Sequence, residues 1–361
     1  MSAIRTSLTR RSLLKTTAGA AAATALIGAP AIAQARSIRI GSYGGYFEDS
    51  FKAHVYPAFT EATGITVESV IQPNSTDWLV TMQQAAAAGR VPADISLYGR
   101  ETILKASRIG GLLKPLDVGA IPTASNLDPY FLFEDATGVI GVGAMSWFLS
   151  MVVNTDETPA PESWADFWTN PEFAQSLGIS RNFTSTFLDI IAATFLGGPE
   201  ALNSRDGIVA AVEKAAELKP QVALWWNAES QMEQALKNGD VIGGTYYHDV
   251  AGLMAADGFP VASVFPKEGN PQNYGSWCLS EGSDKVEEAH EFMAFTSDPA
   301  IQALMSRRIG TAPLVDKAMT DLTDEEFNAV SGAPAIRPAF EAYVDHETFM
   351  KESWEQMLAA S

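Results

Sequence analysis

Short apolar strands and amphipathic helices alternate in the part of the chain that follows residue 35. Apolar residues at every second position indicate the strands, and apolar residues three or four positions apart indicate the helices. These elements occupy, in order, residues 37–41, 46–63, 65–71, 76–88 and 93–98. Strands that alternate with helices at this spacing predict βαβ units and a mainly parallel sheet.

The same alternation returns in the second half of the chain. Its elements occupy residues 177–180, 184–196, 208–218, 222–226, 229–238 and 241–246. Two α/β lobes are therefore the predicted architecture. We expect the chain to cross first between them near Val152, Val153 and Asn154. Ligands of open α/β sheets bind beyond the carboxyl ends of the strands, so residues that directly follow strands are the candidate site residues.

Aromatic side chains recur at these strand ends, where small polar residues are usual. They include Tyr43, Tyr46, Trp225, Trp226, Tyr246, Tyr247, Tyr274 and Trp277. Aromatic walls with a few polar groups between them are typical of a small-molecule pocket. For any single ring, a core position beneath a loop is the alternative.

The composition is that of a globular protein with an acidic surface. The chain has 361 residues, enough for two domains, and its 43 acidic and 24 basic residues give a formal net charge of −19. Such a charge disfavours nucleic acid and anionic membrane surfaces as partners. The single cysteine, Cys278, excludes an intramolecular disulfide and a thiolate zinc cluster.

Residues 1–35 have the pattern of an export signal. Four basic residues and no acidic residue occur in this segment, and small or apolar residues fill positions 16–27. Small residues around Ala33 and Ala35 fit a cleavage site. The apolar run is shorter than the about 20 residues that span a bilayer core, so we expect cleavage and periplasmic localisation rather than membrane insertion.

The basic part of this segment also suggests the route of export. Residues 9–15 resemble the twin-arginine motif through Arg10 and Arg11, with Leu13 where that motif often has phenylalanine. An ordinary secretory signal whose basic region happens to contain two arginines is the alternative.

Six stretches of the mature chain resemble the periplasmic solute-binding proteins of ABC importers, in the spermidine/putrescine-binding branch. They are residues 41–46, 59–67, 93–96, 164–168, 265–269 and 308–313. The resemblance covers essentially the whole mature chain. It implies a two-lobed periplasmic binding protein fold (type II-like), with mainly parallel sheets, flanking helices and a hinge. It also implies a monomer that needs no cofactor and delivers a small solute to an inner-membrane ABC permease.

The resemblance further implies where the two lobes begin and end. Lobe 1 would comprise residues 36–148 plus 270–318, and lobe 2 residues 149–269 plus 319–361. That branch holds ammonium groups with carboxylates and the methylene chain between aromatic rings. The corresponding aromatic positions are Tyr43, Tyr46, Tyr246 and Tyr274.

The acidic positions of that branch are not kept. Ser276 stands where the key acid is expected, and Arg181, Asn182 and Ser185 stand where an acidic pair is expected. Burying an ammonium group without a carboxylate costs several kcal/mol, about half of the roughly 8 kcal/mol of a micromolar complex. An arginine in the same cleft favours a carboxylate or phosphate instead.

We therefore expect an anionic or zwitterionic, amino-acid-like solute. Its amine could be held by Asp249, Glu229 or Glu101, and a polyamine is the alternative solute. The ligand-binding residues expected are Tyr43, Tyr46, Arg100, Arg181, Trp226, Tyr246, Asp249, Tyr274 and Ser276. A structural salt bridge to these same three acids is the alternative role for Arg100 and Arg181.

Catalytic signals are weak in this sequence. The histidines are scattered, with none of them paired at metal-ligand spacing, and we expect His54 and His290 on helix surfaces. Cys278 lies between Trp277 and Leu279 and is expected to be buried. Neither a nucleophile elbow nor a phosphate-binding loop is present. A periplasmic hydrolase is the alternative from another class, and no metal site is expected.

Overall fold

The computed structural model describes residues 36–44, 46–72 and 75–360. The export signal predicted for residues 1–35, with its cleavage site near Ala33 or Ala35, lies outside the described residues. Within the described ranges, every helix is too short or too polar to cross a membrane.

One mixed sheet of eleven strands runs through the described residues, in the order β2-β1-β3-β10-β5-β8-β6-β7. Strands β4 and β9 pair with β5, and β11 pairs with β10. The strands are β1 (Ser37–Tyr43), β2 (Thr66–Gln72), β3 (Ile95–Gly99), β4 (Leu132–Asp135), β5 (Gly138–Asn154), β6 (Leu177–Ser180), β7 (Val222–Trp226), β8 (Gly243–Tyr247), β9 (Val261–Val264), β10 (Asn270–Leu279) and β11 (Ala335–Ile336).

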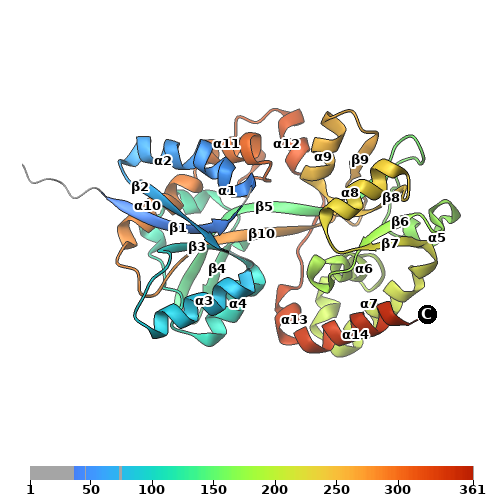
Figure 1. The fold of residues 1–361 in the computed structure, drawn as a ribbon, viewed down its shortest axis with the longest axis horizontal. Helices are drawn as coiled ribbons and strands as arrows, with labels where there is room; N and C mark the ends of the chain where they lie inside the picture. Colours follow the sequence, from blue (N-terminus) through green and yellow to red (C-terminus); the bar gives the residue numbers. More distant parts are fainter. Residues whose placement is uncertain (1–35, 45, 73–74, 361) are drawn as a thin grey trace, which may run out of the picture. The chain divides into compact units, whose positions relative to one another are not determined.

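Helices pack around this sheet (Figure 1). They are α1 (Tyr46–Ser50), α2 (Tyr56–Thr63), α3 (Ser75–Ala87), α4 (Arg100–Ile109), α5 (Asp166–Thr169), α6 (Phe187–Phe195), α7 (Arg205–Glu217), α8 (Glu229–Asn238), α9 (His248–Ala256), α10 (Val286–Thr296), α11 (Pro299–Ile309), α12 (Asp324–Val330), α13 (Phe340–Asp345) and α14 (Glu347–Ala359). A π-helical segment, Phe51–Val55, joins α1 to α2, so the single helix predicted for residues 46–63 has three parts.

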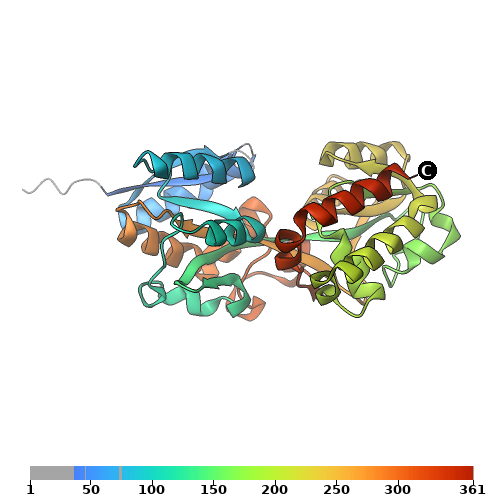
Figure 2. The same cartoon turned by 90° about the horizontal axis from the view of Figure 1, so that it is seen from below.

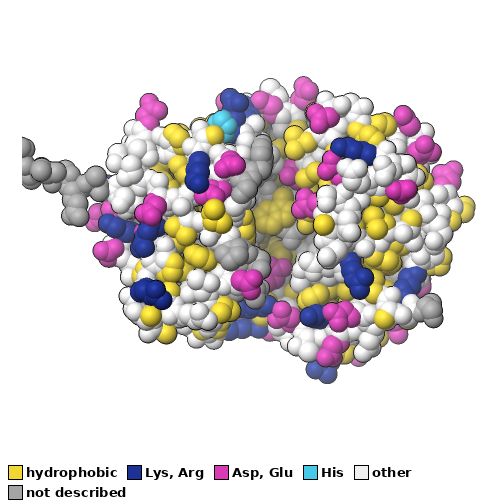
Figure 3. Space-filling view, in the orientation of Figure 1, with side chains coloured by type: hydrophobic (Ala, Val, Ile, Leu, Met, Phe, Trp, Pro, Cys, Tyr) yellow, Lys and Arg dark blue, Asp and Glu magenta, His cyan; other side chains and the backbone are white. Residues whose placement is uncertain are grey.

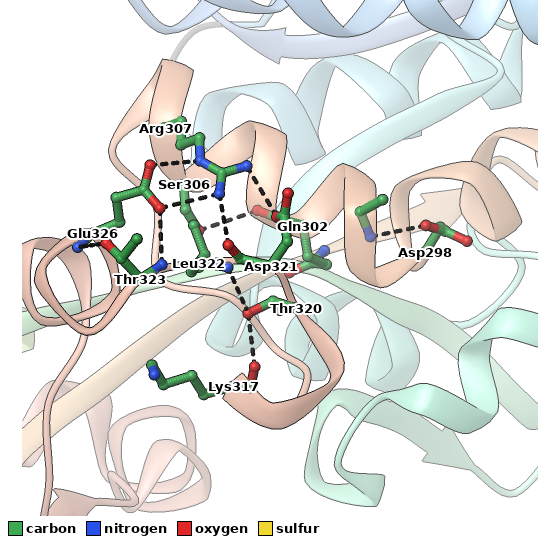
Figure 4. Close-up of polar contacts among 11 residues, drawn as sticks. Asp298, Gln302, Ser306, Arg307, Lys317, Thr320, Asp321, Leu322, Thr323 and Glu326 are labelled. Carbon is green, nitrogen blue, oxygen red and sulfur yellow. Dashed lines mark hydrogen bonds and ion pairs between the residues drawn. The ribbon is translucent and has the colours of Figure 1, made fainter.

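Local side-chain chemistry explains several helix ends. Before α11, the carboxylate of Asp298 accepts a hydrogen bond from the backbone N–H of Ala300, and Pro299 supplies a favourable first helical residue. Thr323 and Glu326 form a capping box that begins α12 (Figure 4). Gly239 ends α8 in the left-handed conformation, with φ of 76°.

The predicted parallel βαβ units are confirmed in both halves. Strand β1 pairs in parallel with β2 and β3, and β6 pairs in parallel with β7 and β8. The pairings of β10 with β3 and β5, and of β5 with β8, are antiparallel. The sheet is therefore parallel at its two outer ends and antiparallel where the long strands join them.

Strands β5 and β10 connect the two halves (Figure 1). Phe148 of β5 pairs with Gln272 of β10, whereas the next residue, Leu149, pairs with Tyr247 of β8. The chain thus changes partners between Phe148 and Leu149, a few residues before Val152, near which the first crossing was expected. Strand β5 is almost continuously buried, so no turn residue signals the change of partner.

The buried apolar residues separate into clusters that match the two predicted lobes. One cluster contains Phe59, Trp277 and Phe292 and draws on residues 38–145 and 274–315, with Phe340 as an addition. A smaller cluster in the same half draws on residues 78–140 and Cys278. Two further clusters draw on residues 149–261 and 336–357, and Figures 1 and 2 place α14 beside α7 in this half. We keep lobe 1 (36–148 plus 270–318) and lobe 2 (149–269 plus 319–361) as a proposal that this separation supports.

Candidate functional site

The parallel strands of each lobe end in residues that the sequence marked as candidates. In lobe 1, β1 ends at Tyr43 and β3 at Gly99, directly before Arg100. In lobe 2, β7 ends at Trp226 and β8 at Tyr247. Figure 3 shows a hollow with apolar side chains at its floor, and in the same orientation Figure 1 has β5 and β10 passing through this region.

Tyr43 and Tyr46 lie at the end of β1 and the start of α1. Tyr43 is half-buried, and its ring meets that of Phe47 edge to face at 6.3 Å between centroids. Tyr46 begins α1, and its side chain is outside the described part of the structure. The backbone of β1 at Gly41 lies close to the side chain of Gln72. A Cβ atom at position 41 would lie only 3.0 Å from Oε1 of Gln72.

Arg100 and Tyr274 lie together in lobe 1. Nη1 of Arg100 donates a hydrogen bond to the Tyr274 hydroxyl at 2.5 Å, and Nη2 donates to Glu341 at 2.9 Å. The guanidinium also lies 4.8 Å from the ring centroid of Phe133. Arg100 therefore forms a structural salt bridge, but its partner is Glu341 and not one of the expected acids Asp249, Glu229 and Glu101.

Tyr274 and Ser276 are both enclosed by lobe 1. Tyr274 is 1% exposed, and its hydroxyl donates a hydrogen bond to the carbonyl of Tyr130. Ser276 is fully buried opposite Tyr98 and Gly143, next to a β-bulge, and its hydroxyl has no partner among the described residues. Ser276 thus lies on β10 between β3 and β5. A contact between Ser276 and a solute remains a prediction.

Trp226 and Tyr246 form a fixed aromatic pair in lobe 2. Their rings meet edge to face at 6.1 Å between centroids, and both are almost fully buried. Nε1 of Trp226 donates to the carbonyl of Thr245 at 3.2 Å, and the Tyr246 hydroxyl donates to the carbonyl of Glu229 at 3.2 Å. Two strand ends and the first residue of α8 are thereby held together.

Two carboxylates lie near this aromatic pair. Partial burial raises the pKa of Asp249 to about 6, and the negative charge of Glu229 adds to the effect. Burial also raises the pKa of Glu229. The pKa of Tyr247 is raised to about 12 by burial and by both carboxylates. Neither acid has a lysine or arginine partner within the described residues, so an added cation would relieve their mutual repulsion.

Arg181 follows β6, the strand between β7 and β8. Its backbone N–H donates to the carbonyl of Trp226 at 2.8 Å, and its own carbonyl accepts from Nε1 of Trp354 at 2.7 Å. The side chain is exposed, and no described residue forms an ion pair or a side-chain hydrogen bond with its guanidinium. Two tryptophans therefore fix the backbone of an arginine whose charged group is free.

Sequence reasoning did not identify several contacts between the lobes. Arg337 lies 4.4 Å from the ring centroid of Tyr130 and forms an ion pair with Asp128 at 2.8 Å. Nδ2 of Asn273 donates to Oγ1 of Thr186 at 3.3 Å. These residues lie in turns or in an antiparallel strand, where neither a helical nor a parallel-sheet pattern distinguishes them.

His54, His290 and Cys278 differ in their exposure to solvent. His54 is exposed as predicted, but His290 is 8% exposed because α10 presents it to the lobe 1 core, so its predicted surface position is wrong. Nε2 of His290 accepts from the backbone N–H of Asp117. Cys278 is fully buried as predicted, and burial raises the pKa of its thiol. The described residues contain no group of three or more potential metal ligands of the His, Cys, Asp and Glu types.

A separate cavity lies on the surface of lobe 2. It has a volume of about 560 Å³ and is lined by residues of α8, of α9 and of the turn after α9, with Lys237, Leu253 and Phe259 among them. We do not assign the solute to it, since its lining contains none of the candidate residues.

Comparison with known proteins gives a consistent family assignment. Residues 55–335 match the family model described as "Bacterial extracellular solute-binding protein". A γ-aminobutyric acid-binding protein of Pseudomonas aeruginosa is 26% identical over 331 residues, which cover 88% of this chain and 90% of that protein.

Solved structures of binding proteins share the fold. The structure described as the Atu4243-GABA receptor has a TM-score of 0.76 at 19% identity, and the match covers 90% of this chain and 98% of that one. The spermidine/putrescine ABC transporter substrate-binding protein of Streptococcus pneumoniae has a TM-score of 0.70 at 18% identity, with 89% and 99% covered. The two-lobed fold and the relationship expected from the sequence are confirmed. The chain belongs to the bacterial extracellular solute-binding proteins.

Proposed function

We propose that this protein is a periplasmic receptor for a small zwitterion of the γ-aminobutyrate type. Such a solute carries an ammonium group at one end of a short methylene chain and a carboxylate at the other. The receptor would bind it between the lobes and deliver it to an inner-membrane permease. Export of the receptor through its residues 1–35, by the twin-arginine route, is part of the same proposal.

The observation that carries this proposal is the pair of opposite, unpartnered charges on lobe 2. Arg181 follows β6 with a free guanidinium, and Asp249 follows the neighbouring strand β8 without a cationic partner. A solute with one charge of each sign can neutralise both. A polyamine carries only positive charge, so it would leave Arg181 unpaired and repelled.

Each end of the solute has a chemically suitable partner. The planar guanidinium of Arg181 can donate two parallel hydrogen bonds to the two oxygens of a carboxylate. An ammonium group beside Asp249 and Glu229 would relieve their repulsion and lower the pKa of Asp249 below its value of about 6 in the free protein. Tyr43 and Tyr247 are half-buried at strand ends and can contact the methylene chain.

The comparisons support this solute class over the alternative. The Pseudomonas aeruginosa relative named above is a γ-aminobutyric acid-binding protein. The polyamine alternative draws on a more distant structural neighbour at 18% identity, which supports the fold but not the ligand. A hydrolase is disfavoured, since the relatives are solute-binding transport proteins and His248 and Cys278 have structural contacts.

The binding mechanism follows from the connection of the lobes. Strands β5 and β10 join lobe 1 to lobe 2, so rotation about them opens and closes the space between the strand ends. The solute shifts this equilibrium only by its higher affinity for the closed form. Contacts from both lobes in the closed form would bury the solute and present one surface to the permease.

Three four-carbon compounds test the solute class by thermal unfolding of the ligand-stripped protein. Putrescine replaces the carboxylate of γ-aminobutyrate by an aminomethyl group of similar size, and butyrate lacks the amine. At about 1,000 times Kd, a ligand stabilises the folded state by about 4 kcal/mol, which raises Tm by several degrees. We expect a shift with γ-aminobutyrate only. A larger shift with putrescine would support the polyamine alternative and contradict the proposal.

A further inference from the structure

Helix α4 of lobe 1 faces the C-terminal helices of lobe 2 through three ion pairs. Arg100 pairs with Glu341 at 2.9 Å, Lys105 with Glu347 at 2.8 Å, and Arg108 with Asp345 at 2.5 Å. All the basic partners belong to α4, and all the acidic partners belong to α13 or the first residue of α14. In these three pairs, lobe 1 supplies the positive charges and lobe 2 the negative charges.

Apolar and cation–π contacts extend the same interface. Phe340, the first residue of α13, packs in the lobe 1 core with its ring 6.0 Å from that of Tyr274. Arg337 lies over Tyr130 and pairs with Asp128. By contrast, Ala342 and Tyr343 of the same helix belong to the lobe 2 core. Helix α13 is thus anchored in lobe 2 and presents one face to lobe 1.

Asp189 fixes this helix in lobe 2. Its fully buried carboxylate accepts hydrogen bonds from the Tyr343 hydroxyl at 2.5 Å and from the backbone N–H of Ala339 at 2.7 Å. Because α13 is held in this way, it moves with lobe 2 when the lobes rotate about β5 and β10. Its ion pairs with α4 must then lengthen or shorten with that rotation.

We propose that α4, Arg337 and helices α13–α14 form an interlobe latch that favours the arrangement in which the lobes are close together. In this role Arg100 stabilises lobe closure and is not a contact of the solute. The pairs are partly exposed, so each contributes little by itself, and the latch acts through their number. Weakening it lowers the population of the closed form that binds the solute tightly.

The test uses Lys105 and Arg108, which are remote from the strand ends. Lys105→Glu with Arg108→Glu places like charges opposite Glu347 and Asp345. Adding Glu347→Lys and Asp345→Arg restores opposite charges in the reversed order. Lys237→Glu is the matched control, since Lys237 pairs with Glu233 inside α8 of lobe 2. Circular dichroism melting of each variant checks that it is folded.

The first readout is the distance between the lobes without a solute. Spin labels at Glu61→Cys in lobe 1 and Asp206→Cys in lobe 2 would report it, and the buried Cys278 does not compete for labelling. We expect the double reversal to shift the distance distribution to longer values and the fourfold swap to restore it. An unchanged distribution, or a swap that fails to restore it, would overturn the proposal.

The second readout is solute affinity with γ-aminobutyrate as the probe. We expect the double reversal to weaken it about fivefold through faster dissociation, and the swap to recover it, while Lys237→Glu has no effect. Since the distance measurement needs no solute, a failure of the proposed solute class leaves the test of the latch intact. Equal affinities in all variants, with γ-aminobutyrate bound, would contradict the latch.

Discussion

Nη1 of Arg100 lies 2.5 Å from the hydroxyl oxygen of Tyr274, a residue 174 positions away along the chain. Both residues were candidates for solute contact from the sequence, and the structure directs them toward each other. A hydrogen bond to a charged donor contributes more to stability than a neutral one. This contact therefore has a stability role that can be measured separately from binding.

Tyr274→Phe removes only the hydroxyl of this pair. We expect the free energy of unfolding to fall by about 1–2 kcal/mol, because Arg100 loses an acceptor in a partly buried position. Urea denaturation measures the change. Solute affinity should stay within twofold of wild type, and a large loss of affinity with unchanged stability would instead place the Tyr274 hydroxyl against the solute.

Asp189→Ala should be among the most destabilising substitutions in lobe 2. The change leaves the Tyr343 hydroxyl and the Ala339 N–H without their acceptor in a fully buried site, at a cost of about 3 kcal/mol in unfolding free energy. Asp189→Asn keeps one acceptor oxygen and should cost less. Equal losses for the two variants in urea denaturation would show that the hydrogen bonds do not account for the effect.

The raised pKa of Asp249 makes its effect on stability depend on pH. Since this pKa is about 6 in the folded protein against an ordinary value of 3.8, the folded state binds the proton more tightly than the unfolded chain does. The contribution of protonated Asp249 to folding stability is fully present below pH 4 and is lost as the pH rises through 6. Asp249→Asn should therefore raise the free energy of unfolding at pH 7.5 by up to about 3 kcal/mol and leave it unchanged at pH 4.

The same carboxylate predicts the pH dependence of binding. An ammonium group needs Asp249 ionised, so wild-type affinity should be constant above about pH 7 and should fall as the pH drops below 6. Titration calorimetry at pH 5 and pH 7.5 measures the difference. Affinity that is independent of pH over this range would mean that Asp249 does not hold the amine.

The periodic parts of the fold could be predicted from the sequence, and the long-range contacts could not. The strand at 222–226 and the helix at 229–238 have their predicted bounds, because glycine, proline or polar residues border clear apolar patterns. The π-helical segment at 51–55 keeps a helical spacing of apolar residues, so periodicity could not distinguish it. The change of partner after Phe148 lies inside a uniformly buried strand and has no local signal.

The candidate site shows the same division. The sequence placed Arg181 and Asp249 directly after strands, and the structure shows that these strands, β6 and β8, are neighbours in the sheet. It could not tell that the partner of Arg100 is Glu341, since the two are 241 positions apart and several other acids were available. Nor could spacing along β10 show that Ser276 is enclosed, because a bulge interrupts the alternation beside it.

The central claim is that Arg181 holds the carboxylate of a zwitterionic solute, and titration calorimetry of Arg181→Ala with γ-aminobutyrate tests it most directly. Arg90→Ala is the matched control, since Arg90 is also exposed but lies in lobe 1 outside the candidate site. We predict that Kd rises at least tenfold for Arg181→Ala and stays at the wild-type value for Arg90→Ala. An unchanged Kd for Arg181→Ala, with binding of γ-aminobutyrate intact, would contradict the account.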